Sequence, residues 1–565
     1  TFGTLSPAVL AQSIGGGGGY APITSERGLA GSRSSLNLNA GAIQFDLSGD
    51  VTTNAFGSDG LLLQSIGAGG GVLGSTSESL TLGASNLANG DAAAISINTT
   101  GTITTIGAQS IGISAQSIGA GGGRAGTASG SITLGANGAI GDGGAVSLNL
   151  AANGGNGSIR TVGDQSPAFV LQSIGGGGGL VFPTTKTSSG NLLLGGGSEG
   201  TQGKGAVINF TAGGSSQVVT SGTGSSGLSY QTIGGGGGYT GSTTAAAQLG
   251  GLYRGISSGA DLKISSQIDA ATNGDDAAAV MVQSIGGGGG RVGDVGTTAN
   301  LGGRTGILGT PDGRGGSIEF TIDSDLTSAG DRGAGAMVQS IGGGGGAAGV
   351  IGGAATLGGL GLSDRSAGNL TITVNNTVGS GGSNAPGLIV QTIGGGGGSV
   401  DTVAGDFTAG RNSALLNTAD TSAGAISFTV NAGAKVFSQK SNSPALIAQT
   451  IGGGGGFASS TAGAVQLGSG GTGTLNADAS SGAINWGNTA GSTGTVASEL
   501  GPIPTITPGI STSGDFSPAV VLQTIGGGGG STTGGTSVSF SAAGHARPST
   551  RSGDITVAHP RATPT

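Results

Sequence analysis

Short apolar runs recur along the chain at nearly regular intervals, and each run ends in the same polar and glycine-rich phrase. In residues 61–63 and 388–390 every side chain of the run is apolar. A strand of this kind is apolar on both faces, which is typical of a strand buried on both sides. Each run is followed by Gln, then Ser or Thr, then Ile and a glycine segment. We therefore expect a buried strand that leads directly into the glycines.

The phrase occurs ten times, and its spacing is the strongest organising signal in the sequence. The first copy contains Gln12, Ile14 and a run of glycines centred on Gly17. Successive glutamines are separated by 52, 52, 56, 59, 52, 56, 52, 58 and 74 residues. A near-constant period of this length is typical of repeats that stack on one another. The ten glutamines are Gln12, Gln64, Gln116, Gln172, Gln231, Gln283, Gln339, Gln391, Gln449 and Gln523.

Strands of a second pattern lie between the copies. In residues 43–47, 146–150 and 318–322 apolar and polar side chains alternate strictly, as expected for a strand with one buried and one solvated face. Shorter segments that end in Gly, such as residues 80–83, precede them. No stretch has the pattern of an amphipathic helix. We predict three or four strands per period and an all-β fold, an elongated parallel β-solenoid (β-helix) of about ten repeats.

The repeat defines the expected domain organisation. We assign residues 1–535 to the solenoid and residues 536–565 to a polar tail or linker, which contains His545 and His559. If each period formed two or three coils, the rod would be on the order of 100 Å long at about 4.8 Å per strand. No signal peptide is visible, and the chain begins inside a repeat. It therefore looks like a cut from a longer protein.

The repeated glutamine has two possible environments. A buried amide without a partner is unfavourable. Stacked repeats would allow each amide to bond the glutamines above and below it, as in stacked-strand fibrils. Alternatively, the side chain points outward to water. The sequence leaves both arrangements open.

The glycine runs have constant length and phase, and only Ala68 and Ala120 interrupt them. A flexible linker would tolerate drift in both. Glycine is required where another backbone approaches closely. We expect stacked, extended segments resembling polyglycine II, whose backbone groups bond laterally and cover one face of the apolar strands. Phosphate binding is disfavoured because no Gly-Lys-Ser/Thr sequence follows any run.

Composition narrows the possible chemistry. Of 565 residues 133 are Gly, charged residues make up 8%, the net charge is −8 and Cys is absent. Without a basic cluster we expect no nucleic-acid partner. No apolar stretch approaches the length of a membrane span. Two histidines and scattered carboxylates offer no catalytic or metal constellation, so we predict no enzyme activity, cofactor or metal.

One further position follows the glycine runs directly. Aromatic or basic side chains occupy it at Tyr20, Arg124, Tyr239, Arg291 and Phe457. A ligand-binding edge would use such residues. Ordinary exposure at the end of a strand is the alternative that we favour from sequence.

The pattern TxGxxSPAxxxQSIGGGGG resembles the Gly-rich passenger repeats of bacterial autotransporter-type surface adhesins. Residues 443–452, SPALIAQTIG, carry this likeness clearly, and it extends over residues 1 to about 535. The resemblance implies a β-solenoid at the bacterial cell surface or released outside the cell. Its implied role is adhesion, aggregation or fibre formation. A C-terminal membrane barrel, which the resemblance would also imply, is missing from the sequence.

These expectations leave three functions open. The first is a non-catalytic rod, either an adhesin-like passenger or the shaft of a surface fibre. The second is a self-assembling filament subunit in which copies stack end to end, with neighbouring copies as partners. The third is a module that binds glycans, a cell-surface receptor or ice through a flat repetitive face.

Overall fold

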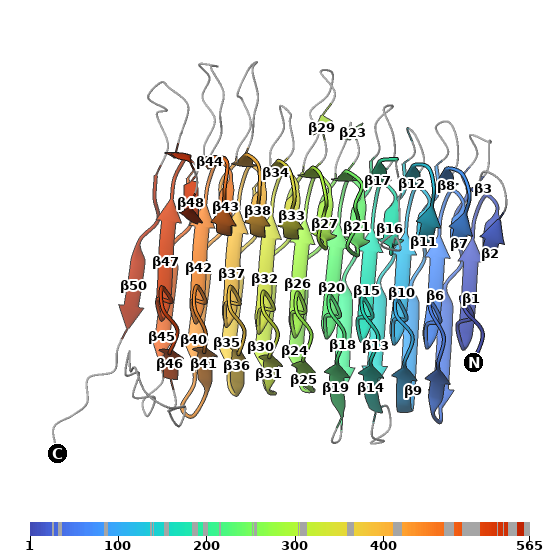
Figure 1. Ribbon diagram of the computed structural model, residues 1–565, viewed down its shortest axis with the longest axis horizontal. Coiled ribbons are helices and arrows are strands. Elements are labelled where there is room, and N and C mark those ends of the chain that lie inside the picture. The colour runs from blue at the N-terminus through green and yellow to red at the C-terminus, as the bar shows by residue number, and fades with distance from the viewer. Residues whose placement is uncertain are drawn as a thin grey trace.

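The computed structural model confirms the all-β solenoid, in which ten coils stack side by side along one axis (Figure 1). It describes residues 1–24, 28–31, 37–83, 89–135, 138, 140–151, 157–182, 190–195, 202–213, 216–250, 252–253, 257–302, 304–305, 313–358, 366–410, 421–467, 480–488, 509–527, 529–534, 536–540 and 551–558.

Each coil follows the same path through up to five strands, which we name A to E. The A strands are β1 (Val9–Ile14), β6 (Leu61–Ile66), β10 (Ile113–Ile118), β15 (Phe169–Ile174), β20 (Leu228–Ile233), β26 (Val280–Ile285), β32 (Ala336–Ile341), β37 (Leu388–Ile393), β42 (Leu446–Ile451) and β47 (Val520–Ile525). The B strands are β2 (Gly18–Thr24), β7 (Gly70–Thr76), β11 (Gly122–Ala128), β16 (Gly178–Val181), β21 (Gly237–Thr240), β27 (Gly289–Val292), β33 (Gly345–Ile351), β38 (Gly397–Val403), β43 (Gly455–Thr461) and β48 (Gly529–Gly534). The C strands are β3 (Gly28–Ala30), β8 (Leu80–Leu82), β12 (Ile132–Leu134), β17 (Leu192–Leu194), β22 (Ala247–Leu249), β28 (Ala299–Leu301), β34 (Ala355–Leu357), β39 (Phe407–Ala409), β44 (Ala464–Leu467) and β49 (Ser537–Phe540).

The D and E strands return the chain to the next A strand. The D strands are β4 (Ile43–Ser48), β9 (Ile95–Thr105), β13 (Val146–Leu150), β18 (Ile208–Ala212), β24 (Leu262–Ser266), β30 (Ile318–Ile322), β35 (Leu370–Val374), β40 (Ile426–Val430), β45 (Ile484–Asn488) and β50 (Ile555–Ala558). The E strands are β5 (Val51–Thr53), the second half of β9, β14 (Gly157–Thr161), β19 (Gln217–Thr220), β25 (Asp269–Thr272), β31 (Leu326–Ser328), β36 (Thr377–Ser380), β41 (Lys435–Ser438) and β46 (Gly509–Thr512). A separate pair, β23 (Leu252–Tyr253) and β29 (Arg304–Thr305), lies in the C-to-D connections.

Every pairing between these strands is parallel, and equivalent residues of successive repeats lie opposite one another. Gln172 of β15, for example, is in register with Gln231 of β20. One repeat therefore forms one coil, and ten layers span about 43 Å at roughly 4.8 Å per layer. The sequence left the number of coils per repeat open, and the length of about 100 Å that two or three coils per repeat would give is not reached. Most coils contain five strands, which is one more than the upper value of the predicted three or four.

The tenth coil continues beyond residue 535. β49 and β50 lie in residues 536–565, for which the sequence predicts a polar tail, and they pair with β44 and β45. Both histidines lie outside the described residues, as does most of the proline-containing insertion near residues 486–508.

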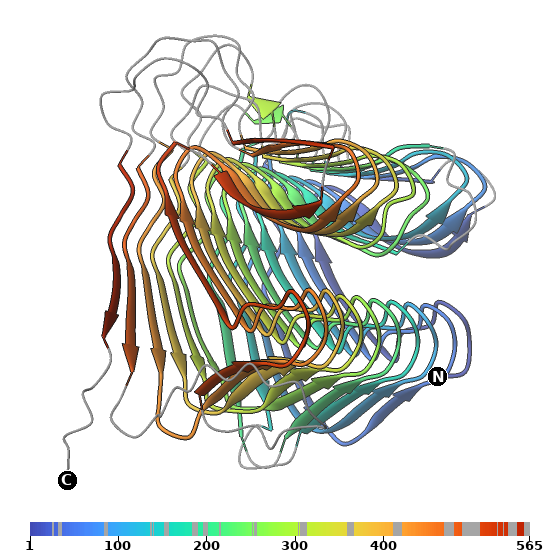
Figure 2. The ribbon, with the colours of Figure 1, turned by 60° about the vertical axis from the view of Figure 1, so that its left-hand side comes forward.

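The coil has two lobes, which Figure 2 shows one above the other. In the larger core, alternate A-strand side chains such as Leu61 and Leu63 pack against Ile95, Ile97 and Ile103 of β9. Apolar positions of the B and C strands enclose the second core in the first nine coils. The strict alternation of the D strands thus buries one face and leaves the other in water, as the pattern predicts.

The glycine runs stack, but their backbone is not polyglycine II. In the fifth coil Gly235 and Gly236 turn the chain with φ of 72° and 83°, and Gly237 and Gly238 begin β21 with φ of 137° and 142°. Because glycine is achiral, polyglycine II has φ near −75° or, in the mirror-image helix, near +75°. The φ of 137° and 142° at Gly237 and Gly238 fits neither. The run is therefore a turn followed by two strand residues in a conformation that only glycine adopts readily.

Close approach of neighbouring backbones explains the need for glycine in the strand positions. A Cβ on Gly237 would lie 2.0 Å from the carbonyl oxygen of Gly289, and one on Gly238 would lie 2.0 Å from that of Gly179. The third glycine, Gly236, packs against Gly195, which directly follows β17, the C strand of the preceding coil. The predicted steric role is therefore found in the interior coils. Gly17, in the first coil, meets nothing within 4 Å.

Candidate functional site

The ten repeated glutamines form one continuous ladder inside the solenoid. Each Nε2 donates to the Oε1 of the glutamine in the next coil, at distances from 2.5 to 3.0 Å. All eight glutamines between the terminal coils are fully buried. Of the two environments that the sequence left open for the repeated glutamine, the structure therefore has the inward one, in which the amides of neighbouring coils bond each other. Together with the adjacent isoleucine ladder it gives the repeated phrase a structural role.

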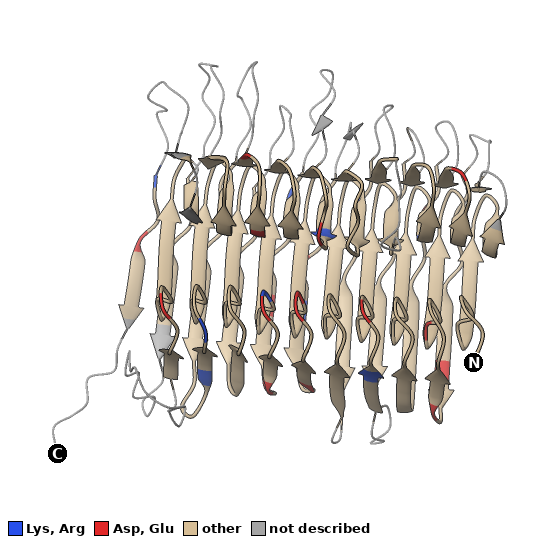
Figure 3. Ribbon diagram, in the orientation of Figure 1, with Lys and Arg blue, Asp and Glu red and all other residues tan. Residues whose placement is uncertain are grey.

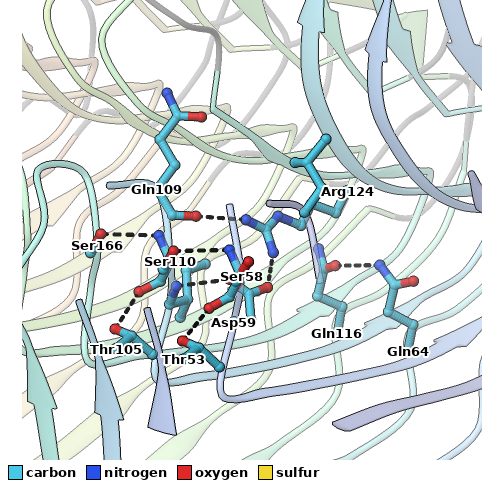
Figure 4. A network of polar contacts seen from close by, with 12 residues as sticks. Thr53, Ser58, Asp59, Gln64, Thr105, Gln109, Ser110, Gln116, Arg124 and Ser166 are labelled. Atoms are coloured by element: carbon cyan, nitrogen blue, oxygen red, sulfur yellow. Dashed lines mark hydrogen bonds and ion pairs between the residues drawn. The ribbon is translucent and has the colours of Figure 1, made fainter. Parts of the chain in front are cut away.

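A second ladder runs through the turns before the A strands of coils one to five and of coils nine and ten. It uses the small residue six positions before the repeated glutamine, which is Ser in seven copies and Ala or Gly in the other three. The N–H of Ser58 donates to the Oγ of Ser110 at 2.9 Å, and that of Ser110 donates to the Oγ of Ser166 at 3.0 Å (Figure 4). Thr53 and Thr105 donate to the serine carbonyl oxygens of their own coils. The sequence feature that could have predicted this ladder is the recurrence of serine six residues before the glutamine.

The two lobes meet along a line of side chains that encloses a small cavity in coils one to four and another in coils six to nine. We call this line the groove, and it is the candidate functional site. Its floor is the second residue of each A strand, such as Met281 and Met337. One wall is the outward face of the B strands, beginning with the residue after the glycines. The other wall is the turn before the A strand. Figure 2 shows the two lobes on either side of this line.

In four coils the turn before the A strand directs one carbonyl group into the groove. Its residue precedes the small residue of the repeat and has positive φ, for example 58° at Gln109 and at Asp276. In four coils the side chain fifteen residues later reaches across and donates to this carbonyl oxygen. These bonds are Tyr20 to Leu5, Arg124 to Gln109 at 2.8 Å, Tyr239 to Gly224 at 3.3 Å and Arg291 to Asp276 at 2.5 Å.

The bridging side chains also stack on one another along the groove. The Arg124 guanidinium lies 5.9 Å from the centre of the Phe182 ring, and the centres of the Phe182 and Tyr239 rings are 5.7 Å apart. The Arg291 guanidinium lies 5.4 Å from the centre of the Tyr239 ring. Arg124, Tyr239 and Phe457 are buried. The predicted ordinary exposure at a strand end is wrong for these three, because the turn packs over them. Tyr20, in the first coil, is 36% exposed.

Ion pairs lie at both ends of this stack, although charged residues are otherwise sparse (Figure 3). Arg124 pairs with the fully buried Asp59 (Figure 4). Burial lowers the pKa of Arg124 to about 10, which still leaves it charged at neutral pH. Arg332 binds Asp276 through two bonds of 2.6 and 2.7 Å.

Two further carboxyl groups belong to the same groove. Burial and the nearby Asp276 raise the pKa of Asp294, against the hydrogen bond from the Val350 N–H. Burial raises the pKa of Asp401 well above its usual range, and Asp276 adds to this effect.

The comparisons with known proteins identify no relative. No family model, no curated protein and no solved structure matches the chain. Within the described ranges no group of three or more His, Asp or Glu side chains is placed to hold a metal ion. Those ranges also contain no helix with the length and apolar character needed to cross a membrane.

Proposed function

We propose that this chain is a non-catalytic structural protein of the bacterial cell surface or extracellular space. It acts as an adhesin-like passenger or as the shaft of a surface fibre, and it mediates adhesion or aggregation. The observation that carries the proposal is the unbroken ladder from Gln12 to Gln523, which joins all ten coils. The resemblance of the repeat to autotransporter passengers supports the location.

The physical basis is a stiff layer structure with a repetitive outer surface. Backbone bonds, glutamine amides and serine hydroxyls all link neighbouring coils, so local opening of one coil would break several ladders at once. The outward positions of the D strands are mostly Ser, Thr and Asn, and they repeat once per layer. A surface of this kind presents the same polar groups many times, which favours multivalent contact.

Surface display tests the proposal. The chain is anchored on a non-adherent bacterial host, and settling and attachment to abiotic and glycan-coated surfaces are measured. We expect faster settling or stronger attachment than with a displayed globular control of the same mass. Unchanged settling and attachment on every surface would contradict the proposed role.

A filament subunit is the second candidate, and the direction of the ladder favours it. Each coil offers Nε2 donors on one side and Oε1 acceptors on the other, so the face of Gln523 complements that of Gln12. Electron microscopy of the purified chain separates the candidates. Long continuous fibres support end-to-end stacking, and isolated ten-coil particles support the passenger.

A further inference from the structure

The floor of the groove contains a pair of methionines. Met281 of β26 and Met337 of β32 lie opposite each other in the register of the A strands, in the sixth and seventh coils. Both line the cavity of about 30 Å³ that lies in coils six to nine. The sequence contains two methionines and no cysteine. All sulfur atoms of the chain therefore lie at one place in the groove.

The two thioethers differ in their access to solvent. Met281 is 1% exposed, whereas Met337 is only partly buried. In the sixth coil Arg291 crosses to the turn and donates to the carbonyl oxygen of Asp276. The seventh coil has Ala347 at this position, and its methyl group is too short to cross. The groove is therefore not bridged in the coil that contains the more exposed sulfur.

A hydroxyl group is already directed at the sulfur of Met337. Nε2 of Gln339 donates to the Oγ of Ser399 at 3.3 Å, and this Oγ donates to the Sδ of Met337, 3.6 Å away. Because the serine oxygen accepts the amide hydrogen, its own hydrogen is available for the sulfur. A thioether is a weak acceptor, so the donor is poorly used while the sulfur is reduced.

We propose that Met337 is an oxidation site of this protein and that the cavity accommodates its sulfoxide. A peroxide is the oxidant. With hydrogen peroxide, the sulfur lone pair forms a bond to one peroxide oxygen, the O–O bond breaks, and the proton of the transferred oxygen passes to the departing hydroxide, which leaves as water. The sulfur is oxidised by two electrons and the peroxide is reduced. The oxidant must reach the sulfur, so the reaction takes place at Met337 and spares Met281.

The sulfoxide has different requirements from the thioether, and the cavity meets them. A sulfoxide oxygen is polar, and in a closely packed apolar core it disrupts the packing. A water-sized group needs about 10–15 Å³, which the cavity provides. Ser399 and Arg332, which both carry hydrogen-bond donors, line it. The flexible methionine side chain lets the new oxygen turn toward them. Oxidation thus makes the groove floor polar without breaking a ladder.

This inference does not depend on the proposed role in adhesion. It is tested by treating the purified full chain with hydrogen peroxide at neutral pH. Trypsin cleaves after Arg291 and Arg332, so the two methionines fall in separate peptides, and mass spectrometry follows the gain of one oxygen in each. We expect Met337 to react roughly ten times faster than Met281 in the folded chain, because a buried sulfur reacts only when its coil opens. In urea the two rates should be equal. Equal rates in the folded chain, or faster reaction of Met281, would overturn the proposal.

Two variants of the bridging position test the route to the sulfur. Ala347→Arg gives the seventh coil the arginine that the sixth coil has, and its Met337 is expected to react as slowly as Met281. Ser531→Arg introduces an arginine at the equivalent position of the tenth coil and is expected to leave the rate at Met337 unchanged. An unchanged rate in folded Ala347→Arg would overturn this route. If thermal unfolding shows that Ala347→Arg does not fold, the comparison of folded and urea-unfolded parent chain decides alone.

Thermal unfolding tests whether the cavity accommodates the sulfoxide. After a treatment that converts Met337 alone, the parent chain is expected to keep its midpoint. Ser399→Ala removes the hydroxyl donor, and we expect its midpoint to fall on oxidation. Ser531→Ala makes the same change in the tenth coil and should behave as the parent chain does. An equal fall in the oxidised parent chain and in oxidised Ser399→Ala would overturn the role of the cavity.

Discussion

The Nε2 atom of Gln172 donates to the Oε1 atom of Gln231 at 2.7 Å, although the two residues are 59 positions apart in the chain. Both side chains are fully buried. Each also bonds the glutamine on its other side, so every interior amide is both donor and acceptor in the ladder. Removing one amide therefore affects two neighbours.

Gln231→Met tests this dependence. The substitution keeps the volume but leaves the Gln172 donor and the Gln283 acceptor unpaired, which costs roughly 2–6 kcal/mol at 1–3 kcal/mol for each buried group. Gln12→Met, in the partly exposed first coil, unpairs only Gln64 and is expected to cost about half as much. Urea unfolding followed by circular dichroism measures both. Equal losses would mean that the ladder is not a continuous buried structure.

The glycine positions are expected to differ in their tolerance of alanine. At Gly237 a Cβ would collide with the carbonyl oxygen of the next coil, and φ is 137°. At Gly235 φ is 72°, close to the left-handed values of 59° and 63° that Ala68 and Ala120 adopt in the same position. We expect Gly235→Ala to cost about 1–2 kcal/mol. We expect Gly237→Ala to prevent the central coil from forming stably, so that thermal unfolding of this variant has a much lower midpoint than that of Gly235→Ala. A comparable midpoint for both variants would contradict the steric account.

Much of this architecture follows from the sequence, and particular residues show where it does not. The period-2 pattern of residues 318–322 predicts β30 correctly, and the constant phase of the glycine runs predicts stacking. The conformation of the run was not predictable from composition, because glycine permits both negative and positive φ. The number of coils per repeat depends on where the chain turns, and those turns lie in sequences that do not recur strictly.

The groove was harder to predict than the ladder. Arg124 and Tyr239 stand out in the sequence because they follow the glycines. Their targets, the carbonyl oxygens of Gln109 and Gly224, have no side-chain signature. The only sequence feature that relates each side chain to its carbonyl is their constant separation of fifteen residues. This separation can be interpreted only when the position of the turn is known.

The buried pair of Arg124 and Asp59 gives a third prediction. Arg124→Leu leaves the carboxylate of Asp59 buried without its partner, which is expected to cost about 3–5 kcal/mol. Asp59→Asn in the same chain removes the charge and still accepts the Ile111 N–H, so the double variant should regain most of the loss. Unfolding of both variants at neutral pH is the measurement. A double variant no more stable than Arg124→Leu alone would show that packing, rather than charge, dominates.

Asp401 gives a prediction about pH. Its pKa and that of Asp294 are raised in the folded chain, beside Asp276, Arg291 and Arg332. Their contribution to stability is therefore fully present below the usual aspartate pKa and is lost as pH rises through the folded values. Asp401→Asn should be more stable than the unmodified chain at neutral pH, because the amide does not have to be ionised or kept protonated in its buried position.

The same variant should lose this advantage as the pH falls, because the unmodified carboxyl group then becomes neutral too. Unfolding midpoints at a series of pH values measure the difference. An Asp401→Asn chain that is less stable at neutral pH would mean that the carboxylate is stabilised by its surroundings, contrary to the description of the groove.

Amide hydrogen exchange of the glycines in the central coils tests the account most directly. The N–H groups of Gly234, Gly236 and Gly237 donate to Ile285, Gly175 and Gly177 in the neighbouring coils. A rigid stacked layer predicts that these amides exchange as slowly as those of the A strand that precedes them. Exchange at the rate of an unstructured glycine chain would contradict the solenoid described above.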